Sequence, residues 1–310
     1  HGGHCCIEGF TEARWYALFP RIALSIPAIK YLRPETKTKM LTLNRPRRSV
    51  LYMPASNPRV LEKAKGLAAD TLIFDLEDAV APDAKSAARD AAVAAVASND
   101  YGHRECLIRV NALDTQWGED DLKAAASSKT DGVIIPKVSA PDEMAQVDDV
   151  LTRCGAADDF PLWAMMETAR GVWAANDIAR SSNRLVGFCA GTADLAKDLH
   201  CTHPADRAPM LTALQLIVLA ARVNGLSVLD GVHVDLNDEA GFAMVCRQGR
   251  DFGFDGKTLI HPKQIAVANE TFAPSADDIA HAQRLIEAHG AAQAKGAAVT
   301  TLDGHLVEVL

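Results

Sequence analysis

The feature that most constrains the fold is a regular alternation of short apolar runs with stretches of helical character. From residue 49 onward eight such runs recur, each rich in β-branched residues and continuous rather than alternating with polar residues. Continuous runs of this kind are typical of strands that are covered on both faces, as in a parallel sheet flanked by helices. The eight expected strands are 49–53, 71–74, 107–110, 132–135, 162–166, 185–188, 227–229 and 258–260.

The segments between these strands carry helix signals. Leu211, Leu214, Val218 and Ala221 share one helical face, and Gly225 follows them as a natural stop. Eight strand–helix units in about 220 residues match a compact (β/α)8 barrel. An open doubly wound sheet would more naturally have a glycine-rich phosphate loop after its first strand, whereas residues 53–58 contain no glycine. We therefore predict an α/β protein with a (β/α)8 TIM barrel.

The segment after the last strand predicts a helix followed by a hairpin. Ser275 and Asp278 have the spacing of a capping box, apolar residues follow at helical spacing, and Gly290 is the expected terminator. Residues 296–310 alternate apolar and polar side chains around Asp303-Gly304, which is a strong hairpin signal. Because the barrel is already complete, this C-terminal helix-plus-hairpin extension is expected to fold outside it, as a flap or partner-binding arm.

Three parts of the chain are expected. Met40 is a plausible natural start, so residues 1–39 are interpreted as a non-native or disordered leader and left out of the fold. Residues 40–272 form the predicted barrel, and residues 273–310 form the extension.

Charge and composition exclude several classes of function. The 310 residues carry a formal net charge of −8 and no long basic run, which argues against a nucleic-acid-binding protein. No apolar run approaches the roughly 20 residues of a membrane helix, so no membrane partner is expected. Seven scattered cysteines indicate reduced thiols and a cytoplasmic protein. A small anionic substrate would need local arginine, lysine or metal.

Reactive side chains follow the ends of most predicted strands, which is where barrel enzymes place their chemistry. In strand order they are Glu77 and Asp78, Arg109, Lys137, Glu167, Asp194, Asp230 and His261. Carboxylates that converge on one barrel mouth repel one another unless a cation joins them, and oxygen ligands suit Mg²⁺, with Mn²⁺ as a substitute. Glu167 and Asp194, at the ends of adjacent strands, are the predicted ligand pair.

Each of these residues also has a structural explanation. A single acid can be a solvated loop residue or a helix N-cap. Arg109 is either a clamp on a substrate carboxylate or enolate oxygen, or the partner of Glu77 or Asp78 in a salt bridge. Lys137 can serve in either way. His261 is a satisfied core histidine or a ligand contact, and Cys189 is interpreted as a core residue rather than a nucleophile.

Seven motifs, in order, carry a resemblance to a known family. They are Arg48-Ser49-Val50-Leu51 with Pro54, Asp75 to Val80, Arg109-Val110-Asn111, Pro136-Lys137, Met166 to Ala169, Gly191 to Leu195, and Gly253 to Lys257 with His261-Pro262. From about Arg48 to Leu310 the chain resembles the citrate lyase β-subunit-like branch of the HpcH/HpaI aldolase superfamily.

The resemblance implies roles for individual residues. It implies that Glu167 and Asp194 bind Mg²⁺, that Glu77 and Asp78 hold metal-bound water, and that Arg109 faces the reacting carbonyl. It also implies that Arg48 and Lys63 lie near the coenzyme A phosphates. The strand-end residues Lys137 and His261 complete the candidate substrate or coenzyme A contacts.

The resemblance further implies a shared active site. Malyl-CoA and citramalyl-CoA lyases place a C-terminal extension over a neighbouring subunit and use an acid there. In this chain the acid would be Glu308, where the family pattern has Asp, so we expect a homo-oligomer, a trimer or hexamer.

The implied function is Mg²⁺-dependent, reversible cleavage of a 3-hydroxyacyl-CoA such as malyl-CoA or citramalyl-CoA. The products would be acetyl-CoA and a 2-oxo acid, glyoxylate or pyruvate. The first alternative is a (3S)-malyl-CoA thioesterase, which yields malate and CoA, because Tyr101 to Arg104, Trp163 to Glu167 and Val307-Glu308 look similar to that sub-branch. The second alternative is a citrate lyase β subunit acting on an acyl-carrier-protein thioester.

Overall fold

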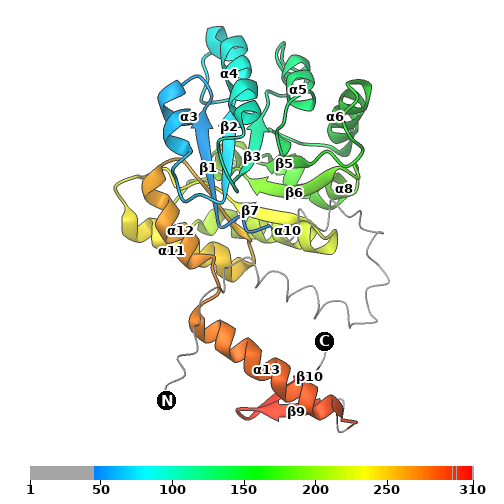
Figure 1. Cartoon of the computed structure of the whole chain (residues 1–310), viewed down its shortest axis with the longest axis vertical. Helices are drawn as coiled ribbons and strands as arrows, with labels where there is room; N and C mark the ends of the chain where they lie inside the picture. The colour runs from blue at the N-terminus through cyan, green and yellow to red at the C-terminus, as the bar shows by residue number, and fades with distance from the viewer. Residues whose placement is uncertain (1–44, 295, 298, 309–310) are drawn as a thin grey trace, which may run out of the picture. The chain divides into compact units, whose positions relative to one another are not determined.

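The computed structural model describes residues 45–294, 296–297 and 299–308 (Figure 1). Among these, residues 45–272 form one compact unit, and the residues from 273 onward belong to another. The expected leader, residues 1–39, lies outside the described residues.

The larger unit is a closed barrel of eight parallel strands, which confirms the predicted fold. Neighbouring strands pair in chain order, and the barrel closes where Val50 of the first strand pairs with Thr258 of the last. The strands are β1 (Ser49–Pro54), β2 (Thr71–Asp75), β3 (Glu105–Arg109), β4 (Gly132–Ile135), β5 (Leu162–Met166), β6 (Leu185–Ala190), β7 (Ser227–Asp230) and β8 (Gly256–Leu259).

The eighth strand lies two residues earlier than expected at its start. The strand β8 begins at Gly256. A Cβ at this position would sit 1.8 Å from the carbonyl oxygen of Arg47, so only glycine allows the two backbones to approach this closely. Ile260 falls just beyond the strand and is 39% exposed.

Helices surround the strands, as Figure 1 shows. They are α3 (Pro58–Ala64), α4 (Lys85–Ser98), α5 (Gly118–Ala126), α6 (Pro141–Arg153), α7 (Ala169–Trp173), α8 (Ala175–Ala179), α9 (Thr192–Asp198), α10 (Leu211–Val223), α11 (Glu239–Phe252) and α12 (Ile265–Thr271), with short 3₁₀ turns η2 (Pro82–Ala84), η3 (Ala208–Met210) and η4 (Pro262–Gln264). The predicted face of α10 is buried at Leu214, Val218 and Ala221, and Gly225 follows with a φ of +65°. None of the described helices is long and apolar enough to cross a membrane.

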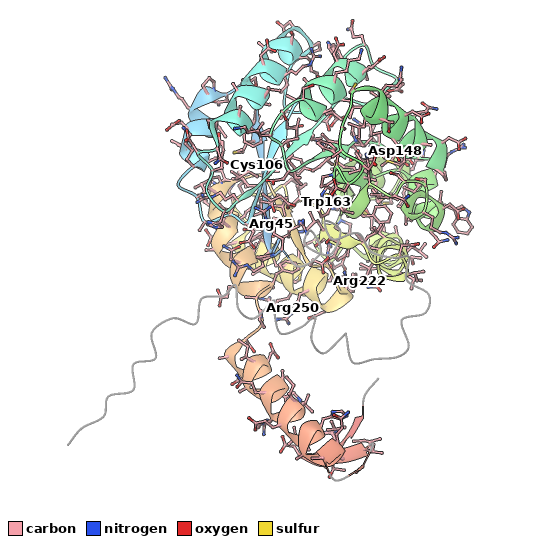
Figure 2. All side chains as sticks on the ribbon, turned by 45° about the vertical axis from the view of Figure 1, so that its right-hand side comes forward. Arg45, Cys106, Asp148, Trp163, Arg222 and Arg250 are labelled. Atoms are coloured by element: carbon pink, nitrogen blue, oxygen red, sulfur yellow. The ribbon has the colours of Figure 1, made fainter. Side chains whose placement is uncertain are left out.

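The amino-terminal end of the barrel is closed by a buried ion pair. Arg47 Nε donates to Glu105 Oε2 at 2.6 Å, and its guanidinium lies 4.9 Å from the ring centroid of Trp163. Trp163, labelled in Figure 2, belongs to the apolar cluster inside the barrel. With this end filled, the carboxyl ends of the strands are left for a pocket.

The second unit contains α13 (Ala276–Ala294) and a hairpin of β9 (Val299–Leu302) and β10 (His305–Glu308). The predicted capping box is present, since Ser275 Oγ accepts from Asp278 N–H and Asp278 Oδ2 accepts from Ser275 N–H, both at 3.0 Å. Asp303 and Gly304 have positive φ angles, as the predicted turn requires.

The predicted end of this helix at Gly290 was wrong. The helix continues to Ala294, because an internal glycine costs only about 1 kcal/mol relative to alanine and good helix formers follow it. Gly296, with a φ of +75°, supplies the left-handed residue beyond the end.

Candidate active site

A pocket of about 320 Å³ opens where the barrel strands end. Side chains from seven of the eight strands or the loops that follow them line it, so the predicted gathering of polar residues at this end is observed. The lining residues are Tyr52, Asp75, Asp78, Ala79, Arg109, Met165, Glu167, Ala190, Gly191, Thr192, Ala193, Asp194, Val232, Thr258 and Ile260.

Arg109 is held in the pocket wall by a two-point ion pair. It is the last residue of β3 and stands in register with Asp75, the last residue of β2. Its Nε donates to Asp75 Oδ1 at 2.7 Å and its Nη2 donates to Asp75 Oδ2 at 2.6 Å, while Nη1 lies 2.9 Å from Glu77 Oε2. The salt bridge to Glu77 is therefore present, but Asp75 is the main partner, and Arg109 still lines the pocket.

Lys137 joins the acidic loop after β2 to the end of β5. Its Nζ pairs with Glu77 and lies 3.5 Å from Asp78 Oδ1, and its backbone N–H donates to Glu167 Oε1 at 2.7 Å. The φ of Lys137 is +53°, which is unusual for a residue with a side chain and indicates that the surrounding contacts constrain this backbone. Arg109 and Lys137 thus stand between the carboxylates of the pocket.

The pKa values of the two acids of this loop, Glu77 and Asp78, are shifted in opposite directions. Burial raises the pKa of Glu77, against the opposing charges of Arg109 and Lys137. Desolvation acts in the same direction on the more exposed Asp78, but Arg109 and Lys137 outweigh it and lower the pKa of Asp78. Asp78 is therefore an ionised carboxylate at neutral pH.

Glu167 and Asp194 both line the pocket, and the charge of Asp194 acts on Glu167. Glu167 is 2% exposed and directly follows β5, and Asp194 is half-buried in the first turn of α9. A Cβ on Gly191 would sit 2.3 Å from Glu167 Oε2, so glycine at this position gives the carboxylate its room. Burial raises the pKa of Glu167 to about 7, and the charges of Glu77 and Asp194 add to this effect.

These two carboxylates fit a divalent cation. A buried carboxylate with a raised pKa and an acidic neighbour gains from a cation, which removes the repulsion. Within the described residues no group of three or more His, Cys, Asp or Glu side chains is arranged to hold a metal. Mg²⁺ needs only one or two carboxylates, with water or substrate oxygens completing its coordination, so the pair agrees with that ion.

Lys85 is a site-supporting residue that the sequence analysis missed. Its buried Nζ donates to the carbonyl oxygens of Leu76 and Glu77 and to Asn111 Oδ1, each at 2.8 Å. It thereby holds the backbone of the loop that carries Glu77. Local pattern gives no signal for such a residue, because its acceptors are 8 to 26 residues away.

Of the predicted ligand contacts only Arg109 lines the pocket; Lys137 stands behind the lining residues Asp78 and Glu167, and the other three lie elsewhere. Arg48 precedes β1 at the amino end of the barrel, where its Nε and Nη2 bind Asp70 at 2.8 and 2.9 Å. Lys63 is exposed in the last turn of α3, the helix that leads from the carboxyl end of β1 back toward the amino end of β2. His261 caps η4, with its Nδ1 accepting from Lys263 N–H at 3.1 Å, which favours the structural explanation of this histidine.

Glu308 ends β10 in the second unit. Its side chain is outside the described part of the chain, so its role stays a prediction.

Comparison with known proteins places the chain in a family. Residues 48–262 match the profile of HpcH/HpaI aldolase/citrate lyase. The chain belongs to this family. The predicted resemblance is thus confirmed.

Two similar relatives are a thioesterase and a citrate lyase subunit. The (3S)-malyl-CoA thioesterase of Cereibacter sphaeroides is 50% identical over 265 residues, which cover 86% of this chain and 90% of the relative. The citrate lyase subunit beta of Escherichia coli is 35% identical over 269 residues, covering 85% and 89%. The prediction that the chain is an enzyme, a lyase or thioester hydrolase, is confirmed at this level.

Solved structures of relatives carry the ligands expected at such a site. The citrate lyase β subunit of Mycobacterium tuberculosis, complexed with oxaloacetate and magnesium, matches with a TM-score of 0.65 and 31% identity over 75% of this chain and all of its own. The CitE protein of the same organism, in complex with magnesium, acetoacetate and coenzyme A, matches with a TM-score of 0.67 and 31% identity, covering 84% and 92%. The predicted magnesium cofactor is supported by these relatives.

Proposed function

We propose that this enzyme hydrolyses the thioester of (3S)-malyl-CoA, or of a closely similar acyl-CoA, in a Mg²⁺-dependent reaction. The observation that carries the proposal is the 50% identity with (3S)-malyl-CoA thioesterase along 265 residues. Hydrolysis was the first alternative on sequence grounds. Carbon–carbon cleavage of a 3-hydroxyacyl-CoA, which the motifs favoured, is kept as the second candidate because the family includes citrate lyases.

Glu167 and Asp194 are the residues that would hold Mg²⁺ in this proposal. When bound, the ion would polarise oxygen atoms of the acyl group and offset the charge of the two carboxylates. Gly191 leaves the space in which Glu167 stands, and the Lys137 N–H fixes one of its oxygens at 2.7 Å. These contacts fix the position of the Glu167 carboxylate of the pair.

Arg109 would bind the thioester oxygen on which negative charge develops. Asp75 occupies Nε and Nη2, so the guanidinium cannot turn, and Nη1, 2.9 Å from Glu77 Oε2, is the nitrogen left to share with a substrate oxygen in the pocket that Arg109 lines. A donor held in this way stabilises developing charge without reorganisation. Hydrolysis and carbon–carbon cleavage both develop charge on that oxygen, so Arg109 would serve either reaction.

Glu77 and Asp78 are the candidates to hold and orient water. Lys137 and Arg109 lie within 4 Å of both carboxylates, which keeps them beside the pocket. In the cleavage reaction the proton would instead come to the acetyl-CoA enolate from Glu308 of a neighbouring subunit. The trimer or hexamer that this requires stays a prediction.

Product analysis with malyl-CoA and citramalyl-CoA, with and without Mg²⁺, tests the proposal. Free CoA and malate without a 2-oxo acid are expected. Acetyl-CoA together with glyoxylate or pyruvate would instead establish the lyase, and activity on an acyl-carrier-protein thioester alone would establish the citrate lyase type. Turnover that is independent of Mg²⁺ would contradict the metal assignment.

A matched pair of variants on α9 sharpens this assay. Asp194→Asn should abolish activity, because one carboxylate of the ligand pair is lost. Asp198→Asn should retain it, because Asp198 is exposed one turn later and bonds only to the backbone of Ala169 in the contacts observed. Equal activity of the two variants would remove Asp194 from the site.

A further inference from the structure

Tyr52 lies inside the pocket beneath Arg109. It belongs to β1, where it and Val50 face the apolar cluster inside the barrel. Its ring centroid is 4.8 Å from the Arg109 guanidinium carbon, and its side chain lines the pocket. Its hydroxyl group has no part in the proposed roles of Arg109, Glu167 and Asp194.

The hydroxyl of Tyr52 and Nη1 of Arg109 converge on one sulfur atom. Tyr52 Oη lies 3.6 Å from Met165 Sδ, and Arg109 Nη1, which also lies 2.9 Å from Glu77 Oε2, is 3.7 Å from the same sulfur atom. A thioether sulfur is a weak acceptor, so it does not satisfy the hydroxyl well. Inside a protein, a hydroxyl without a strong partner is uncommon, and it indicates a place reserved for water or a ligand.

We propose that Tyr52 is a catalytic residue whose hydroxyl donates a hydrogen bond to the thioester carbonyl oxygen of the substrate, beside Arg109 Nη1. The inference rests on the proposed function, since it requires an acyl thioester in this pocket. Two donors aimed at one oxygen form the kind of site that stabilises an oxyanion.

The charge state of Tyr52 agrees with a donor role. Burial raises the pKa of Tyr52 well above its ordinary value, and Cys189, Asp75 and Glu167 add to this against the opposing charge of Arg109. The phenol therefore keeps its proton throughout the neutral range. A protonated phenol can donate to an oxyanion, whereas a phenolate would repel it.

The competing explanation is that only the ring matters. A tyrosine ring under a guanidinium gives a cation–π contact, which would hold Arg109 in place without any use of the hydroxyl. Phenylalanine keeps the ring and removes the hydroxyl, so Tyr52→Phe separates the two explanations. Because the hydroxyl bonds only to Met165 Sδ among the contacts observed, this variant should fold normally.

The test is steady-state kinetics of Tyr52→Phe with malyl-CoA and Mg²⁺. We expect kcat to fall by about a hundredfold, the effect of removing one oxyanion donor, with KM changed far less. Tyr101→Phe is the matched control, because Tyr101 is buried against Phe74 and donates to Leu61 O outside the pocket. A kcat within about twofold of wild type in Tyr52→Phe would overturn the inference, since it would leave no measurable donor effect.

Binding measurements separate failure of this inference from failure of the proposed function. If the wild-type enzyme turns over neither malyl-CoA nor citramalyl-CoA, the proposed function fails, and calorimetry with acetyl-CoA and Mg²⁺ becomes the test of Tyr52, because acetyl-CoA carries a thioester carbonyl. Tyr52→Phe should then bind acetyl-CoA about tenfold more weakly, because a hydrogen bond to the thioester oxygen is lost. Equal binding by the two proteins, or no binding by either, would overturn the assignment of Tyr52.

Discussion

Replacing Glu167 with glutamine should stabilise the metal-free protein at alkaline pH and remove its response to magnesium. Burial, with the charges of Glu77 and Asp194, raises the pKa of Glu167 from 4.5 to about 7. In the unfolded chain this carboxyl regains its ordinary pKa, so between these values the native state holds a proton that the unfolded state has lost. The stability of the wild-type protein therefore falls as the pH rises through this window, by about 3 kcal/mol in total.

Glutamine removes this pH dependence without removing the structural contact. Its side chain stays neutral, and its carbonyl oxygen can still accept the Lys137 N–H that now bonds to Glu167 at 2.7 Å. Near pH 8 the metal-free variant should exceed the wild type in unfolding free energy by up to about 3 kcal/mol, and near pH 4 the two should be equal. Mg²⁺ should raise the unfolding free energy of the wild type only, because it binds the carboxylate of Glu167 in the native state.

Urea unfolding at both pH values, with chelator or with Mg²⁺, measures these differences. Glu270→Gln, an exposed position on α12, is the control for the loss of one negative charge. If metal-free wild type and Glu167→Gln show the same pH profile, or if Mg²⁺ stabilises both equally, the proposed electrostatics of the site are refuted.

Three further predictions concern the surroundings of the metal pair. Arg109→Lys should lower kcat by about a hundredfold, because lysine cannot bind Asp75 through two nitrogens and hold a third, Nη1, toward the substrate. Near-normal kinetics would make Arg109 purely structural. Lys85→Met should lose about 3 kcal/mol in urea unfolding, because three acceptors lose their donor; unchanged stability would contradict this. For the carbon–carbon cleavage, in which Glu308 would be the proton donor, mixing inactive Glu308→Gln with inactive Asp194→Ala under subunit exchange should restore part of the activity, and mixed oligomers that stay inactive would rule out a shared site.

The barrel could be predicted because its signal is local. A strand that is apolar throughout can be recognised from its own residues alone. For this reason β4 and β5 were predicted with the bounds observed. The start of β8 was missed because Lys257 is a charged residue in a strand. Its ammonium is fully buried and lies 3.0 Å from Asp230 Oδ2, a partner in the neighbouring strand that no local pattern reveals.

The site was predicted in part for the same physical reason. The strand-end rule selects Arg109, Glu167 and Asp194 without knowledge of the register, and all three line the pocket. The pairing of Arg109 with Asp75 depends on the register of β2 against β3, so the sequence analysis named the neighbouring acids instead. Arg48 was carried over from the resemblance, and its place before β1 puts it at the opposite end of the barrel.

The charges of the pocket also suggest an order of binding. Asp75, Glu77 and Asp78 form ion pairs with Arg109 and Lys137. These two cations are therefore already neutralised by acids before the charges of Glu167 and Asp194 are counted. A malyl group brings a further carboxylate into this surplus of negative charge and would be repelled. A divalent ion reverses the balance locally and supplies the attraction that the protein groups lack. Substrate binding should therefore follow Mg²⁺ binding, and the ion would also offset the burial that, together with the charges of Glu77 and Asp194, raises the pKa of Glu167.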